Sequence, residues 1–407
     1  MSTKRRPTGA VAPHDITRST MLRRLGIGTG SVVVAGGVGI GFRAWEQGIF
    51  TPESGIAYEP WQRWQTFTGP PALVAAAILA ANAHNLQPWV FHVADSRIDL
   101  FADPVRNLGA ADPLRREMDV SLGCALENLA LAAEPNGYTA DVHILPDAAT
   151  PAHIARVGLS RRRQRSSKLY EQIPHRHTNR GPFDAARGVS EDMLQRMNVA
   201  GDSGSSDSRI FWLTTLAQRQ RLGKLLVEAT EAFIADDAQS RASYAGIRFD
   251  LPAIQRQKDG LTLDTQGLTN TFAAIAKLLP ASSRAAGDSF WLASTRDIHV
   301  ATAQAYGMVA VRNVHDRSQR LSGGRLLQRI HLAATEQGLA LHHMNQLTER
   351  ADREQSLGLR PRFGSALRTL IPAPWQTLVT FRMGYPLRAA HLSPRRSVHD
   401  VVVADPR

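Results

Sequence analysis

Apolar and polar residues follow two different periods along this 407-residue chain, and together they predict a helix-rich α+β fold. Residues 121–137 and 322–338 carry apolar residues at helical intervals, and each segment ends at a glycine suited to a helix C-terminal cap. Residues 216–236 show the pattern of a longer amphipathic helix. Strands are predicted at 138–145, 209–216 and 375–386, the last with period-two alternation. Residues 281–325 contain few strand signals, which favours a covering loop there.

The helical segments 121–137 and 322–338 also resemble each other residue by residue. Without a gap, the same residue stands at Ser121/Ser322, Gly123/Gly324, Leu126/Leu327, Leu131/Leu332, Ala132/Ala333, Ala133/Ala334 and Gly137/Gly338. Two unrelated core helices are the alternative, but the shared start and stop signals favour duplication. A duplicated chain often encloses an axis like that of a homodimer. We therefore predict two tandem repeats in an intrachain pseudo-dimer, over residues 70–160 and 165–407, with an insertion near 240–325.

The stretch AANAHNLQPWVFHV at residues 80–93 joins a helical pattern to a strand pattern through an unusually polar corner. Amide or imidazole side chains stand at four positions, Asn82, His84, Asn85 and Gln87. A plain turn needs a glycine, an aspartate or a single asparagine. The surplus of hydrogen-bonding groups predicts a polar ligand at this corner. Trp89 begins the strand, so we expect it in the core and not against the ligand.

Two arginine-containing motifs suit a phosphate group. In HRHTNRGPF (175–183), Arg176 and Arg180 lie four residues apart, as on one helical turn, with Thr178 between them. Two guanidinium groups and a hydroxyl can surround one oxyanion. The motif SPRR offers Arg395 and Arg396 as a second candidate. Taken alone, a motif like the first more often marks the solvated, basic end of a helix. A motif like SPRR more often marks a flexible tail.

The polar corner occurs only in the first half of the chain. The HTNR motif, defined here as residues 177–180 together with the preceding Arg176, occurs only in the second half. The second half has VAGDSGSSDSR where the first half has the corner, and the first half opens with FTGPPALV, which carries no charge. Each half therefore lacks what the other half supplies. One composite site per chain is more economical than two sites.

Composition limits the remaining classes of function. Lys and Arg number 48 against 36 Asp and Glu, a net charge of +12, and a basic surface attracts nucleic acid, anionic lipid or phosphorylated ligands. Nucleic-acid binding is disfavoured because aromatic residues make up only 6% and do not alternate with basic ones. Cys124 is the single cysteine, which excludes an intrachain disulfide and a thiolate metal cluster. The neighbours His342 and His343 make a poor metal pair, and no hydrolase, zinc-protease or phosphate-loop motif is present.

Residues 1–50 have the layout of a targeting segment. Arg23-Arg24 precede about eighteen weakly apolar, glycine-rich residues, as in a twin-arginine export signal. No Ala-x-Ala cleavage motif follows, so the segment is predicted to be an export signal or a membrane anchor. Export by the twin-arginine route would place the protein in the periplasm or on the membrane. A buried glycine-rich helix in a cytoplasmic protein is the alternative.

These motifs, between about Pro71 and Val403, resemble those of the nitroreductase superfamily of FMN-dependent oxidoreductases, especially its duplicated, Acg-like branch. The resemblance implies that Asn85 meets the flavin, with Asn82 and Ala83 at the preceding contacts. It also implies that Arg176, Thr178 and Arg180 bind the phosphate and the ribityl hydroxyls of FMN. It also implies that Arg395 or Arg396 completes the phosphate site. His84 departs from the family pattern, which has a small residue there.

The resemblance further implies a nitroreductase-like fold in which two repeats replace two subunits and keep one site per monomeric chain. Reduced nicotinamide, NADH or NADPH, would deliver hydride through FMN to an unidentified small acceptor. No protein nucleophile is required, so no catalytic residue is predicted, and neither a metal nor nucleic acid is expected. Residues 246–269 resemble an insertion of the Acg-like branch that could cover the flavin. A flavin-sequestering protein without turnover is the alternative function.

Overall fold

The computed structural model describes residues 43–44, 46–202 and 206–404. The predicted export segment therefore lies almost wholly outside the described residues. Within the part that is described, no helix combines the length and the apolar character needed to cross a membrane.

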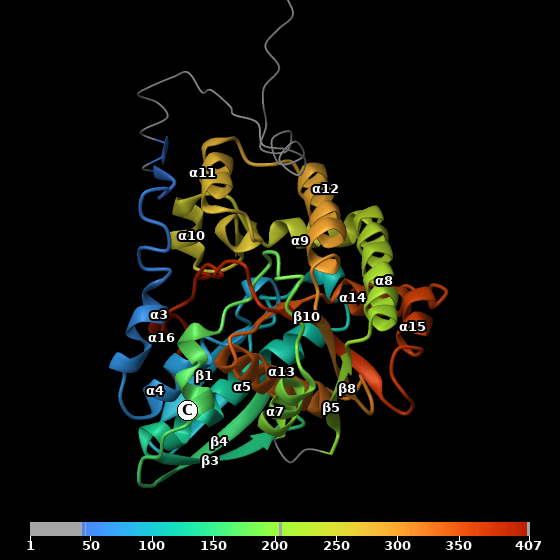
Figure 1. Cartoon of the computed structure of the whole chain (residues 1–407). Coiled ribbons are helices and arrows are strands. Elements are labelled where there is room, and N and C mark those ends of the chain that lie inside the picture. Colours follow the sequence, from blue (N-terminus) through green and yellow to red (C-terminus); the bar gives the residue numbers. More distant parts are fainter. Residues whose placement is uncertain (1–42, 45, 203–205, 405–407) are drawn as a thin grey trace, which may run out of the picture.

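Two four-stranded antiparallel sheets form the framework, one from each half of the chain (Figure 1). The first sheet consists of β1 (Trp89–Ala94), β2 (Arg97–Ala102), β3 (Tyr138–Ile144) and β4 (His153–Arg161), in the order β1-β2-β4-β3. The second consists of β5 (Ser208–Leu213), β8 (Ala305–Val311), β9 (Ala340–His343) and β10 (Gln376–Gly384), in the order β5-β8-β10-β9. Taken in chain order, both sheets have the arrangement first, second, fourth, third.

The two central helices, α5 (Arg116–Ala133) and α13 (Arg317–Glu336), pack against each other in the main core. Their closest approach is at Gly123 and Gly324. A Cβ atom on Gly123 would lie 2.2 Å from the carbonyl oxygen of Leu321, and one on Gly324 would lie 2.2 Å from that of Val120. The backbones can come this close only because both residues are glycines. The small residues of the predicted helices thus serve helix–helix contact.

Most of the elements expected from the sequence are confirmed. Strands β3, β5 and β10 coincide with the predicted strands, and α8 (Leu216–Ala235) coincides with the long amphipathic helix. The prediction of few strands in residues 281–325 misses β8. Every residue of β8 is buried, so its sequence AYGMVAV shows no alternation of apolar and polar positions.

A helical insertion separates β5 from β8, where the first sheet has only the two-residue turn between β1 and β2. It contains α8, α9 (Asp237–Ala245), α10 (Leu251–Gln257), α11 (Asn270–Leu278), α12 (Arg284–Ser294) and a short parallel pair, β6 (Ile247–Arg248) with β7 (Leu261–Thr262). Helices α9 to α12 lie together at the top of Figure 1, and α8 runs down the right side below them. The insertion occupies residues 214–304, whereas 240–325 was expected from the sequence. Residues 305–325 instead belong to β8, to the beginning of α13 and to the loop between them.

The remaining helices frame the sheets, and the tail of the chain returns to the first half. They are α3 (Glu59–Arg63), α4 (Pro70–Ala77), α6 (Lys168–Glu171), α7 (Glu191–Gly201), α14 (Gln346–Ser356), α15 (Arg362–Leu367) and α16 (Val398–Val401). After β10, the backbone N–H of Arg395 donates to the carbonyl of Ala57 over 2.7 Å. Val402 forms a parallel bridge with Phe91 of β1. The first half is therefore completed by residues from the end of the second.

Candidate functional site

A cavity of about 230 Å³ lies where the two halves and the insertion meet. Its wall includes residues of the polar corner, the first turns of α5, the segment after α6, the end of β9, the beginning of α14, and the insertion. The polar lining residues from the two halves are Asn82, His84, Glu117, Ser121, Thr178, Arg180, His342, His343, Asn345, Gln346 and Glu349. A polar pocket built from both halves fits the expected composite site.

The polar corner has an unusual backbone. His84, Asn85 and Gln87 all have φ between 47° and 57°, in the left-handed region that side chains other than glycine rarely adopt. Within the corner, the Asn82 side-chain oxygen accepts a hydrogen bond from the backbone N–H of Gln87 over 2.8 Å. The amides thus fix an otherwise unfavourable chain path, and this path leaves Asn82, Ala83 and His84 in the cavity wall.

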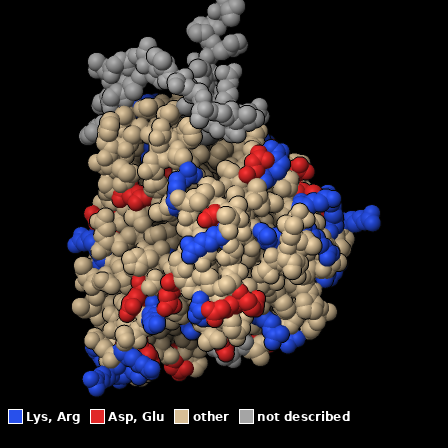
Figure 2. All heavy atoms as spheres, viewed as in Figure 1, with Lys and Arg blue, Asp and Glu red and all other residues tan. Residues whose placement is uncertain are grey.

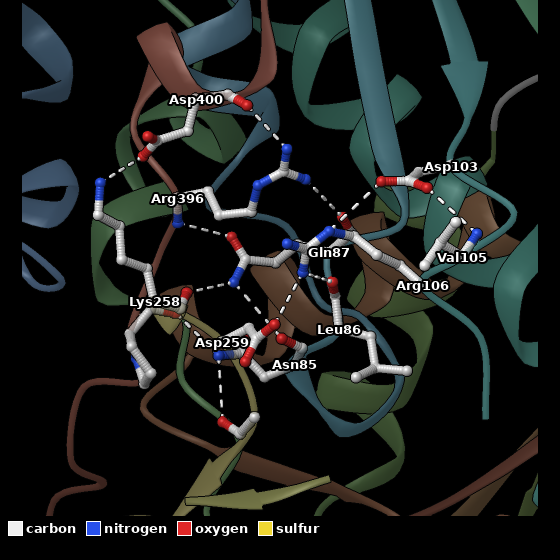
Figure 3. A network of polar contacts seen from close by, with 12 residues as sticks. Asn85, Leu86, Gln87, Asp103, Val105, Arg106, Lys258, Asp259, Arg396 and Asp400 are labelled. Atoms are coloured by element: carbon white, nitrogen blue, oxygen red, sulfur yellow. Dashed lines mark hydrogen bonds and ion pairs between the residues drawn. The ribbon is translucent and has the colours of Figure 1, made fainter. Parts of the chain in front are cut away.

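Asn85 and Gln87 join the corner to two distant segments, and Figure 3 shows Gln87 between Lys258 and Arg396. Gln87 donates to the Lys258 carbonyl over 2.7 Å and accepts from the backbone N–H of Arg396 over 2.8 Å. Asn85 donates to the Pro394 carbonyl over 2.8 Å and accepts from the Arg395 guanidinium. Neither amide lines the cavity. Their role here is to hold the insertion and the tail against the corner.

The residues of the HTNR motif do not form a helical turn, which corrects the geometry expected from the sequence. A short 3-10 helix ends at His175, Arg176 is extended, and Thr178 makes a parallel bridge with Leu341. The Arg176 guanidinium is buried and donates to the Leu79 carbonyl over 2.9 Å, outside the cavity wall. Thr178 and Arg180 do line the cavity. The two guanidinium groups therefore point to different places.

Arg395 and Arg396 also lie outside the cavity wall. Arg395 is 2% exposed and donates to the Ala80 carbonyl over 3.2 Å. Arg396 donates to the carbonyls of Gln87, over 3.3 Å, and Asp400, over 2.7 Å. Of the eight residues expected at the cofactor, the structure thus brings together Asn82, Ala83, Thr178 and Arg180 around one cavity. It uses Asn85, Arg176, Arg395 and Arg396 to hold backbone segments behind that cavity.

Arg180 forms no ion pair among the described residues. Its guanidinium donates to the Thr265 carbonyl over 3.1 Å, and burial lowers its pKa to about 10, which leaves it charged at neutral pH. His299 hydrogen-bonds to its backbone. A positive charge that faces an enclosed cavity without a carboxylate partner favours an anionic ligand.

Imidazole side chains near Arg180 are kept neutral. Burial, followed by the charge of Arg180, lowers the pKa of His84 to about 4. Burial, followed by the charges of Arg176 and Arg180, lowers that of His343 to about 3. His84 Nδ1, His299 Nδ1 and His343 Nε2 are buried without a hydrogen-bond partner among the described residues. All three residues line the cavity, and their unpartnered nitrogens can accept or donate hydrogen bonds.

Two carboxyl groups that sequence reasoning missed also line the cavity. Glu117 on α5 and Glu349 on α14 are 6% and 8% exposed, and their carboxyl groups lie against each other. Burial, followed by neighbouring carboxyl groups, raises the pKa of both. The sequence gives no signal for this pair, because the two residues come from different halves and belong to no motif.

The insertion contributes an aromatic wall. Phe233, Tyr244, Phe249, Phe290 and Trp291 all line the cavity. The rings of Phe233 and Trp291 meet edge to face, with centroids 5.1 Å apart. Such a wall excludes water and suits a planar ring system. No group of three or more His, Cys, Asp or Glu residues that could hold a metal ion occurs among the residues that the structure describes.

Comparison with known proteins gives partial sequence matches. No protein-family model matches the chain. Over 113 residues the chain is 33% identical to "Putative NAD(P)H nitroreductase Rv3131" of Mycobacterium tuberculosis, which covers 27% of this chain and 33% of that protein. It is 34% identical over 87 residues to "Putative NAD(P)H nitroreductase acg" of the same organism, covering 21% and 26%. The chain thus spans about a third or less of the length of the curated relatives it matches.

Solved structures give a more distant likeness. The FMN-dependent nitroreductase NfnB of Mycobacterium smegmatis, solved in complex with NADPH, is 17% identical, with a TM-score of 0.36, covering 58% of this chain and 98% of that one. A nitroreductase of Bacteroides fragilis with bound FMN is 15% identical, with a TM-score of 0.32, covering 57% and 95%.

Proposed function

We propose that this protein is an FMN-dependent oxidoreductase of nitroreductase type, which transfers hydride from reduced nicotinamide through FMN to a small acceptor. The partial sequence similarity to NAD(P)H nitroreductases supports the class of reaction. The cavity supports the cofactor, because its wall combines a cation, unpartnered imidazole nitrogens and aromatic rings. FMN presents the complementary groups, namely a phosphate, ribityl hydroxyls and a planar ring.

The observation that carries the proposal is the unpaired charge of Arg180. A half-buried cation without an anionic partner is costly, and the cost is offset when an anionic ligand binds. Thr178, two residues before Arg180, adds a hydroxyl to the same wall. In the proposed complex, Arg180 and Thr178 hold the anionic part of FMN, and Asn82 and Ala83 contact the cofactor from the corner.

The other predicted cofactor residues support these contacts indirectly. Arg176 and Arg395 hold the backbone around Leu79 and Ala80, just before the corner. Arg396 holds the corner through Gln87. When bound, FMN supplies the hydride chemistry, while the protein provides position, charge and a water-poor cavity.

We further propose that the chain arose by duplication and holds one FMN. The two sheets share one strand order, and Gly123 and Gly324 make reciprocal contacts with the opposite helix. Cys124 lines the cavity, but the next residue after Gly324 is Arg325, whose guanidinium binds Glu127 over 2.7 Å. A long charged side chain thus stands where an equivalent second site would need space. A monomer with one composite site follows from this proposal.

The decisive experiment is the absorbance spectrum of the purified protein, recorded before and after addition of NADH or NADPH. We expect a flavin spectrum that is bleached by reduced nicotinamide and restored by an acceptor. A folded, colourless protein that does not take up added FMN would refute the proposal. A flavin that stays oxidised with both nicotinamides, while the protein retains it tightly, would instead support the flavin-sequestering alternative.

A further inference from the structure

We propose that Glu117 and Glu349 share one proton and donate it to the acceptor bound in the cavity. This inference rests on the proposed function, since it assigns the proton that must accompany hydride transfer. Both side chains line the cavity, each comes from a different half of the chain, and each lies in the first turn of its helix. No motif or similarity assigns a role to either residue.

The contacts of Glu117 require a proton between the two carboxyl groups. Its side chain meets the carboxyl group of Glu349 and the side chain of Asn345. Two carboxylates that lie against each other in a buried site repel, so the pair holds one proton between them at neutral pH. Glu117 Oε1 remains buried without a partner among the described residues. Glu117 lines the cavity, and this oxygen is the atom of its carboxyl group that still needs a partner.

The charged groups around Glu117 favour a proton shared with Glu349 over an ion pair between Glu117 and an arginine. Arg116 is the nearby cation that acts on Glu117, but its guanidinium is held by Asp352 and donates to the Thr377 carbonyl over 2.9 Å. Asp112 adds further negative charge beside the pair and accepts from the backbone N–H of Met118 over 3.0 Å. The N-termini of α5 and α14 favour ionised carboxyl groups. Burial and like charge outweigh that effect, because the pKa values of both glutamates are raised.

A second, independent feature indicates that a ligand meets this wall. His299 is 4% exposed, lines the same cavity, and has no partner for Nδ1 among the described residues. It lies in a π-helix, Thr295–Val300, a rare conformation that often marks functional sites. Its ring stands edge to face against His342, with centroids 4.6 Å apart. An unsatisfied imidazole and a proton-sharing carboxyl pair in the wall of the same cavity describe a site for a polar acceptor.

The proposed step balances for a quinone acceptor. A reduced flavin supplies a hydride equivalent, that is, two electrons and one hydrogen nucleus. The shared carboxyl proton moves to a quinone oxygen, so that one carboxyl O–H bond breaks and a hydroquinone O–H bond forms. The pair is left as two carboxylates and takes up a proton from solvent. Proton donation by a positioned carboxyl group typically contributes about 10²- to 10⁴-fold in rate.

Infrared spectroscopy tests the shared proton without relying on flavin turnover. In the purified protein we expect a protonated-carboxyl band that persists at neutral pH and disappears at alkaline pH. The band should be lost or displaced in both Glu117→Gln and Glu349→Gln. It should remain in Glu354→Gln, a matched control on α14, since buried Glu354 binds the backbone N–H groups of Phe363 and Gly364 outside the cavity. A wild-type protein with no protonated carboxyl group at neutral pH would overturn the proposal, whether or not the protein binds FMN.

Turnover with 1,4-benzoquinone as the probe tests donation. We expect Glu117→Gln to lower kcat at least tenfold, to remove the alkaline fall of the pH–rate profile, and to leave FMN content unchanged. Glu354→Gln should behave like wild type. If Glu117→Gln and Glu349→Gln both lose the infrared band but keep the wild-type kcat and pH profile, the pair is structural and the donor role is wrong. If the wild type binds no flavin, the proposed function fails even though the infrared result stands.

Discussion

Gly123 and Gly324 face each other across the central helix pair, and each leaves room for only a backbone carbonyl of the opposite helix. A methyl group on either residue would lie 2.2 Å from that carbonyl oxygen. We expect Gly123→Ala and Gly324→Ala each to lower the free energy of unfolding by about 1–3 kcal/mol or more, because two rigid helices must separate. Urea unfolding measures the effect. Gly364→Ala on α15 is the control, since its added methyl group meets nothing closer than 3.7 Å; equal losses in all three variants would contradict the close approach.

Replacement of Arg180 and replacement of Arg176 should differ in their effects on FMN affinity. Arg180→Ala removes a cation from the cavity wall, so we expect the FMN dissociation constant to rise roughly ten- to a hundredfold. Arg176→Ala leaves the Leu79 carbonyl unpaired behind the wall, so we expect lower stability with a smaller change in affinity. Fluorescence titration of the flavin-free protein measures the first effect and urea unfolding the second. Equal loss of FMN affinity in both variants would place both guanidinium groups at the phosphate, as expected from the sequence.

Gln87 should control the attachment of the tail and the insertion to the corner. Gln87→Ala removes the hydrogen bonds to Lys258 and to the N–H of Arg396. Unpaired buried groups of this kind cost about 1–3 kcal/mol each. We therefore expect faster amide hydrogen exchange in residues 393–398 and 258–262, and unchanged exchange in β4. Unchanged exchange throughout would show that the amide is dispensable for holding these segments.

Stability should depend on the Glu117 proton at neutral to alkaline pH. Burial, followed by the charge of Asp112, raises the pKa of Glu117 to about 8, whereas an unfolded glutamate titrates near about 4.3. The folded protein keeps a proton that the unfolded chain releases, so this contribution is complete below the lower value and is lost as pH rises towards the upper one. Relative to wild type, Glu117→Gln should become more stable between pH 5 and pH 8.5 in urea unfolding. A difference that stays constant with pH would show an ordinary ionised carboxylate.

The export segment requires its own test, because it lies outside the described residues. Replacing Arg23 and Arg24 by lysine should leave the protein in the cytoplasm, since twin-arginine export depends on the arginine pair. Cell fractionation with an antibody against the protein measures the distribution. If the variant fractionates like the parent protein, the export prediction is wrong and the cytoplasmic alternative stands.

The net charge of +12 alone suggests a polyanionic partner. The distribution of charged side chains over the surface fits a small-molecule partner better. Figure 2 shows Lys and Arg side chains interspersed with Asp and Glu over the face in view, without a continuous basic field. Many arginines are engaged inside the protein, such as Arg116 with Asp352 and Arg320 with Asp119. Such ion pairs leave the net charge of +12 unchanged, but they remove these arginines from the surface.

Sequence reasoning found the elements whose patterns are local and missed those defined by tertiary contacts. The amphipathic helix α8 was predictable because it has one buried face. Strand β10 was predictable because its sequence alternates apolar and polar residues, although all but its first residue are buried. Strand β8 was not, since its sequence AYGMVAV shows no such alternation. The corner and the HTNR motif did lead to the cavity, through Asn82 and Thr178. Glu117 and Glu349 could not be found, because only the fold places these two ordinary glutamates side by side.

The return of the tail to the corner has a consequence for synthesis of the protein. Arg396 meets Gln87 across 309 positions of the chain, and Val402 extends the sheet beside Phe91. Until the ribosome has translated residues 393–403, the corner lacks these partners and is held only by its other contacts, such as the hydrogen bond between Asn82 and the Gln87 N–H. The cavity can therefore close only after residues 393–403 have left the ribosomal tunnel, and under the proposed function FMN is retained only from that point on. Truncation before residue 393 should yield a chain that retains many of its helices but never turns yellow.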